Sequence, residues 1–191
     1  MPDKPVLKNM SVEEYLAYEQ GTANKREYVD GKLRLIDEAS PQHNKIVLNC
    51  WQSLRNQLAL SPYLVHNTVH DTNRRIKIDD KNYLHPDIFV LSLDSEFCDD
   101  AERIISSPVL IAEVMSPRSK NHDRSKKRER YLKNKNHKIQ LYIFEEEPLI
   151  TIYTPHKDGW LLQDFRGLDA VIPLKAIGCE LKLSEAYLDV F

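Results

Sequence analysis

The spacing of apolar and polar residues predicts a long helix followed by several short strands. From His43 to Leu60 the apolar residues recur at intervals of three and four, which predicts a helix with one buried face. Pro41 lies shortly before this segment and suits the entry to a helix. Tyr63–Ile78 reads as a pair of strands, and Tyr83–Leu93 reads as one strand that Pro86 interrupts near its start, where proline is tolerated.

Two buried strands and a basic helix are predicted in the second half of the chain. The apolar run from Val109 to Ala112 is too short for a helix and suits a strand buried on both faces. It leads directly to a charged residue, Glu113. A lysine- and arginine-rich segment that begins at Asp123 has the residues of a helix, and Ile139–Phe144 is another buried strand.

Local signals at the two ends of the chain complete the pattern. Ser11-Val-Glu-Glu14 is a capping box that predicts a short helix, and Asp30-Gly31 is a strong hairpin signal. A second hairpin is predicted from 149 to 165, and a short amphipathic helix at the C-terminus. Strands dominate the middle, with a long helix before them and another among them. We therefore expect a single domain over residues 1–191, α/β or α+β in class, with a mixed sheet flanked by helices.

Composition supports one cytoplasmic domain. At 191 residues, 41% of them hydrophobic, the chain can bury one core and is short for two. Its three cysteines, Cys50, Cys98 and Cys179, form no CxxC pair, which argues against a disulfide framework or a structural zinc site and favours a reducing compartment. No apolar run approaches the roughly 18 residues typical of a membrane span, and the N-terminus lacks the apolar core of a signal peptide.

The charge is distributed unevenly. The formal net charge is −2, but the segment from Ser116 to Lys138 holds ten Lys and Arg residues against Asp123 and Glu129. Such a basic face suits a phosphate-bearing partner, although a charge run of this kind is often only a solvated face.

Two carboxylates stand out because they flank predicted strands. Asp87 directly precedes an apolar strand and Glu113 ends one, so the two could share a hard cation such as Mg²⁺, which takes oxygen ligands. Lys127 on the basic helix could position a water molecule or offset charge developing on a phosphate. The alternative is that both acids are strand-end charges paired with arginine or lysine. Taken alone, Glu27 reads as an ordinary surface acid and His43 as a packing histidine near the start of a helix.

An ordered set of motifs carries a family resemblance over roughly Ser11 to Phe191. His-Pro-Asp87 precedes an apolar strand, Ala-Glu113-Val-Met-Ser-Pro117 ends another, and Lys127 and Tyr131 follow at four-residue intervals from Asp123. Further matches flank these motifs: Arg26-Glu27-Tyr-Val-Asp-Gly31, Ser40-Pro-Gln-His43-Asn, the strand from Gln140, and Gly159-Trp160. The set resembles the Uma-type family of restriction-endonuclease-like proteins, in the PD-(D/E)XK nuclease superfamily.

The resemblance implies a fold, an activity and a set of site residues. The fold is a restriction-endonuclease-like central mixed β-sheet with an αβββαβ core, and the activity is Mg²⁺-dependent hydrolysis of DNA phosphodiester bonds, with Mn²⁺ as a substitute. Asp87 and Glu113 would hold the metal, and Glu27 would support it through water. The superfamily lysine should stand two residues after Glu113, where this chain has Met115; in the Uma-type pattern that lysine moves to the next helix, at Lys127.

The resemblance also suggests how DNA is held, and it leaves rivals open. The basic helix would meet the backbone phosphates, and cutting both strands would favour a homodimer. The expected DNA-contacting residues are His43, Arg124, Lys126, Arg128 and Arg130. One rival is a catalytically silent DNA-binding or assembly protein that keeps the fold, with Met115 as the mark of lost activity. Another is a carboxylate-pair hydrolase that acts on a different phosphate ester.

Overall fold

The computed structural model describes residues 6–19, 26–36, 38–70, 74–101, 103–116, 121–134 and 137–191, without the side chains of 6–8 and 121–125. Its helices are α1 (Val12–Glu19), α2 (Pro41–Leu58), α3 (Asn121–Lys133) and α4 (Leu183–Ala186), with a short 3₁₀ turn η1 (Lys175–Ile177). The strands in the first half are β1 (Val6–Asn9), β2 (Arg26–Val29), β3 (Lys32–Leu35), β4 (Tyr63–Asn67), β5 (Arg75–Asp79), β6 (Asn82–Leu84) and β7 (Ile88–Ser92). Those in the second half are β8 (Ile104–Ile105), β9 (Leu110–Met115), β10 (Ile139–Phe144), β11 (Leu149–His156), β12 (Gly159–Arg166), β13 (Val171–Leu174) and β14 (Cys179–Lys182).

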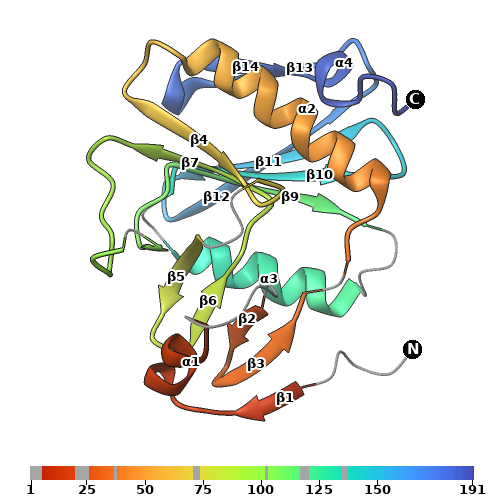
Figure 1. The fold of residues 1–191 in the computed structure, drawn as a ribbon. Helices are drawn as coiled ribbons and strands as arrows, with labels where there is room; N and C mark the ends of the chain where they lie inside the picture. The colour runs from red at the N-terminus through yellow and green to blue at the C-terminus, as the bar shows by residue number, and fades with distance from the viewer. Residues whose placement is uncertain are drawn as a thin grey trace.

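The larger part of the molecule is built on a six-stranded sheet in the order β12-β11-β10-β9-β7-β4, which we call the main sheet. The neighbours β4, β7 and β9 pair antiparallel, whereas β9 and β10 pair parallel. Helix α2 and the β13–β14 hairpin cover one face, and α3 lies on the other (Figure 1). In chain order, α2, β4, β7, β9, α3 and β10 form an αβββαβ core, so the predicted fold class is confirmed.

A second six-stranded sheet, in the order β1-β3-β2-β6-β5-β8, lies on the far side of α3 (Figure 1). Its β2–β3 hairpin turns at Asp30 and Gly31, whose φ angles of 52° and 77° give the type I′ turn that the sequence predicts. The tyrosine rings of Tyr15, Tyr28 and Tyr83 pack together where α1 covers this sheet.

One prediction about strands was wrong, and another was right about the strands but leaves their pairing to be described. Tyr83–Leu93 is not one interrupted strand, because β6 belongs to the second sheet and β7 to the main sheet. Pro86 has no N–H to donate to a ladder, so the chain leaves one sheet there and enters the other. The two strands predicted in Tyr63–Ile78 are present as β4 and β5, but they do not pair with each other: β4 pairs with β7, and β5 pairs with β6. The side chain of Asn67 accepts hydrogen bonds from the N–H groups of Val69 and His70 and so turns the chain at the end of β4.

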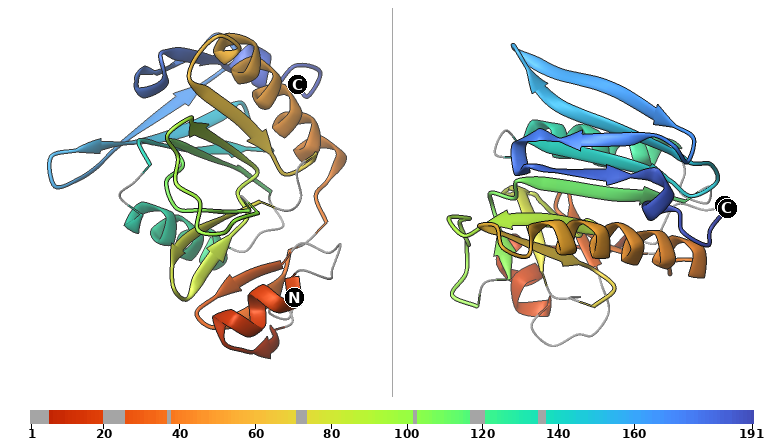
Figure 2. Two further views of the ribbon diagram at one scale, coloured as in Figure 1. Left: turned by 60° about the vertical axis from the view of Figure 1, so that its left-hand side comes forward. Right: turned by 90° about the horizontal axis from the view of Figure 1, so that it is seen from above.

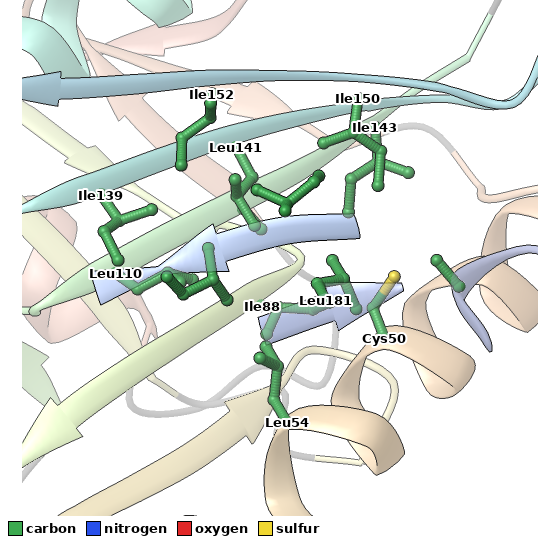
Figure 3. Close-up of a cluster of buried hydrophobic side chains, with 14 of the residues drawn as sticks. Cys50, Leu54, Ile88, Leu110, Ile139, Leu141, Ile143, Ile150, Ile152 and Leu181 are labelled. Carbon is green, nitrogen blue, oxygen red and sulfur yellow. The ribbon is translucent and has the colours of Figure 1, made fainter. Parts of the chain in front are cut away.

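Strand alternation decides which side chains of the main sheet reach each face. Alternate residues of β7, β9, β10 and β11 enter a core with Cys50 and Leu54 of α2 (Figure 3). The intervening residues Phe89 and Ile111 face α3 and pack near its Tyr131. Because side chains alternate with a period of two, Asp87 and Glu113 also lie on the α3 face. None of the helices in the described ranges is long and apolar enough to cross a membrane.

Candidate active site

The two acids singled out in the sequence meet on neighbouring strands. In the antiparallel register of β7 and β9, Ile88 pairs with Ala112. One step further along, Asp87 stands opposite Glu113. The backbone N–H of Val114 donates to Oδ2 of Asp87 at 2.8 Å, which fixes this carboxylate against β9.

Lys127 reaches the same point from α3. Its Nζ lies 2.8 Å from Oε1 of Glu113 and 2.9 Å from Oε1 of Glu27 on β2. It also donates to the backbone carbonyl of His85 at 3.3 Å. One helical turn later the hydroxyl of Tyr131 donates to the same Glu113 oxygen at 2.8 Å. The four-residue spacing therefore directs both α3 side chains towards Glu113.

The charges of Glu113, Glu27 and Lys127 depend on how deeply they are buried and on the contact of the Lys127 ammonium with both acids. Burial raises the pKa of Glu113 to about 8, although the Lys127 ammonium opposes the shift. Burial would also raise the pKa of Glu27, but Lys127 outweighs it and holds that pKa below its ordinary value. In return, the carboxylates overcome the effect of burial and raise the pKa of Lys127, so the lysine is charged at neutral pH.

His43 lies beside Asp87, at the start of α2. Ser40 caps this helix by accepting a hydrogen bond from the His43 N–H at 2.9 Å. The ring Nε2 then lies 3.2 Å from Oδ1 of Asp87. Burial lowers the pKa of His43, but the Asp87 carboxylate outweighs burial and the net pKa is raised. The same contact holds the pKa of Asp87 below its ordinary value against the effect of burial.

The basic residues of α3 lie in different environments. Lys126 is exposed, whereas Arg128 is half-buried and donates to the Tyr153 hydroxyl at 3.4 Å. Arg130 forms an ion pair with Asp30 at 2.5 Å and donates to the side chain of Asn82 at 3.0 Å, so it joins α3 to the second sheet. The side chain of Arg124 lies outside the described residues.

Two residues near the site were not selected from the sequence. Tyr142 on β10 stands beside Glu113 in the parallel register, and its buried hydroxyl has no hydrogen-bond partner among the described residues. Glu145 follows the same strand; its Oε1 accepts a hydrogen bond from Ser40, while its buried Oε2 has no described partner. For Tyr142 the signal was the pleat of β10, which becomes informative once its register with β9 is known, whereas Glu145 lies beyond the end of that strand.

The donor set suits a cation that needs few protein ligands. No three His, Cys, Asp or Glu side chains in the described part of the chain gather as a metal cage. Mg²⁺ is commonly held by one or two carboxylates and keeps several waters, so Asp87 and Glu113 would suffice. The contacts of Glu113 with described residues use Oε1 and leave Oε2 for a ligand. The side chains of Asp87 and Lys127 are 17% and 26% exposed, so the site is partly accessible to solvent.

We expect cation binding to depend on pH through Glu113. Between its ordinary pKa near 4.5 and the raised value of about 8, the metal-free folded protein holds a proton that binding must displace. Mg²⁺ affinity should therefore rise with pH and level off near pH 8, at most about tenfold per pH unit. Calorimetry at pH 7 in two buffers of different ionisation enthalpy should show proton release that disappears at pH 9. An affinity independent of pH from 6 to 9 would contradict the raised pKa.

The fold is of the restriction-endonuclease-like structural class. A crystal structure described as "a putative nuclease belonging to DUF820 from Anabaena variabilis" aligns with a TM-score of 0.75, covering 95% of this chain and 99% of that one at 17% identity. Residues 12–186 match the model of the Uma2 family, described as "Putative restriction endonuclease". The chain therefore belongs to the Uma2 family, and the predicted resemblance is confirmed.

Two relatives come from Synechocystis sp. (strain PCC 6803), and both are described only as uncharacterized. The chain is 29% identical to protein slr1290, over 97% of this chain and 95% of that protein. It is 27% identical to protein sll1609, over 86% of this chain and 92% of that protein. The similarity thus extends over nearly the full length of each relative.

Proposed function

We propose that the protein is a Mg²⁺-dependent endonuclease that hydrolyses phosphodiester bonds in DNA, with Mn²⁺ able to replace Mg²⁺. The observation that carries the proposal is the meeting of Asp87, Glu113 and Lys127 on one face of the main sheet. A structural ion pair needs one cation for one acid. Here one ammonium contacts two acids and a third carboxylate lies opposite, beside His43, so three carboxyl groups converge and a divalent cation could take the place of the proton that Glu113 holds.

Each residue would have a distinct task. Asp87 and Glu113 would hold the metal, which supplies Lewis-acid activation of the phosphate and of a water nucleophile when bound. Lys127 would orient the attacking water and offset charge developing on the phosphate. Glu27 contacts Lys127 directly, and we therefore assign it the positioning of that ammonium in addition to the water-mediated support of the metal.

DNA would approach along α3. Lys126 is exposed and Arg128 lies near Tyr153, so both are available for backbone phosphates. Arg130 would have to give up its bonds to Asp30 and Asn82 to make the same contact. His43 would meet DNA beside Asp87. We also infer a reducing, cytoplasmic location from three free cysteines, and a homodimer from the need to cut two strands.

The test is the conversion of supercoiled plasmid to nicked and linear forms with Mg²⁺ or Mn²⁺. We expect the parent protein to cut and EDTA to stop it, and an exposed-acid variant, Glu129→Gln, to cut like the parent. Duplex binding should weaken with salt, with a slope near −0.9 per phosphate contact. If the parent binds DNA in this way and binds metal, yet cuts no substrate with either ion, the silent DNA-binding protein becomes the better account.

A further inference from the structure

Strand β12 forms an open edge of the main sheet. Within the described residues it pairs with β11 on one side and with no strand on the other. The β11–β12 hairpin extends away from the body of the molecule (Figure 2). Leu161 and Leu162, which point to opposite faces of the strand, are 43% and 50% exposed. A long edge strand with exposed leucines is the kind of edge that proteins usually cover or block.

The backbone groups that face outwards can be identified from the hairpin. A two-residue turn, Lys157-Asp158, makes His156 and Gly159 the first hydrogen-bonded pair. At the other end, the N–H of Gly167 donates to the carbonyl of Pro148 at 2.9 Å. Odd-numbered residues of β12 therefore bond to β11. The N–H and C=O groups of residues 160, 162, 164 and 166 lie in the plane of the sheet and point outwards from its open edge.

We propose that this edge pairs with β12 of a second copy of the chain, antiparallel and about a twofold axis at Leu162. Only a pairing of even-numbered with even-numbered residues joins the outward-facing groups. With Leu162 opposite the partner's Leu162, the turn residue Asp158, next to the start of β12, comes beside the partner's Arg166 at the end of the strand, and symmetry repeats that pair. A shift of two residues would instead place Trp160 opposite the partner's Arg166 and lose both ion pairs, so charge favours the pairing about Leu162 over this shift.

The charges on either side of Leu162 are self-complementary, and this is the reason to propose a second copy of the chain as the partner and not a strand of another protein. Asp158 and Arg166 lie four residues on either side of Leu162. Opposite charges placed symmetrically about a leucine match the same strand reversed, and the contact closes as an isologous dimer. A foreign segment would need an unrelated sequence with that pattern. Both Asp158 and Arg166 are exposed, which leaves them accessible to the second copy.

The dimer would form a continuous twelve-stranded sheet, because each copy contributes six strands. A twofold axis through an antiparallel strand pair is perpendicular to the sheet, so the two α3 helices lie on the same side. Both candidate sites would then face one duplex. This last consequence rests on the proposed function, whereas the interface itself does not.

Analytical ultracentrifugation over a range of protein concentrations tests the interface without any need for cleavage. We expect the parent to dimerise and Leu162→Lys to be monomeric at the same concentrations, because it places two ammonium groups together at the axis. Leu168→Lys, at an exposed leucine outside the strand, should dimerise like the parent. A monomeric parent, or a dimer that persists in Leu162→Lys, would overturn the inference.

Charge reversal tests the register. Asp158→Arg and Arg166→Asp should each weaken the dimer by about tenfold or more, because two attractive pairs become repulsive. The double variant should restore the parent's affinity. Arg166 also contacts Glu147 within the chain at 3.1 Å, but loss of that contact cannot produce restoration in the double variant. Absence of restoration would overturn the register. A dimer that never cuts DNA supports the interface and counts against the proposed function. A monomer that cuts DNA supports the proposed function and counts against the interface.

Discussion

Replacing Lys127 by alanine is expected to lower the rate of plasmid cleavage by about 10³-fold while metal binding remains measurable. The side chain contacts Glu113 and Glu27 and carries no cation ligand, so its loss removes positive charge from the phosphate and the water but leaves both proposed metal-binding carboxylates in place. Single-turnover cleavage and Mg²⁺ calorimetry on the same preparation measure the two effects separately.

The neighbouring residue supplies the control for this variant. Lys126 is exposed on the same helix, and Lys126→Ala should weaken DNA binding but cleave at the parent's rate once DNA is saturating, because its charge does not reach the acids. Met115→Lys in the Lys127→Ala background should restore part of the activity, because residue 115 lies two positions after Glu113 and points to the same face of β9. A Lys127→Ala protein that cuts as fast as the parent would rule out the migrated lysine.

The core of the fold could be predicted because its signals are local. The helical spacing of apolar residues in α2, the short buried runs of β9 and β10, and the basic helix between them predicted a mixed sheet flanked by helices, and the family resemblance implied the αβββαβ order. The Asp30-Gly31 turn was equally visible, since its backbone conformation depends on those two residues. The position of the second sheet was not predictable in this way. Pro86 reveals a break in strand pairing but does not reveal which sheet receives each side of the break.

The site was predictable in its residue types and only partly in its contacts. Asp87 and Glu113 could be paired because both flank strands, and the motif spacing placed Lys127 on the next helix. The contact between Lys127 and Glu27 joins residues 100 positions apart in different layers, and no local pattern encodes it. In the same way, Tyr142 lies beside Glu113 only because β9 and β10 pair in one particular register.

Asp87→Asn is expected to remove both metal binding and cleavage, unlike the lysine variant. The amide is nearly isosteric, and its side-chain oxygen can still accept the hydrogen bond from the Val114 N–H, so the strand pairing should persist. A neutral amide oxygen is a poor ligand for a hard cation, and the change removes one of two negative charges offered to it.

The loss should exceed about 10³-fold in cleavage, with the calorimetric signal for Mg²⁺ absent at concentrations that saturate the parent. Circular dichroism and the thermal midpoint check that the variant is folded. Asp169→Asn, at an exposed acid outside the site, should match the parent in every measurement. His43 offers an internal check: without the Asp87 carboxylate its pKa should fall, and an NMR titration of the imidazole would show it. If Asp87→Asn still binds Mg²⁺ like the parent while the His43 pKa falls, then Asp87 pairs with the histidine and does not hold the metal.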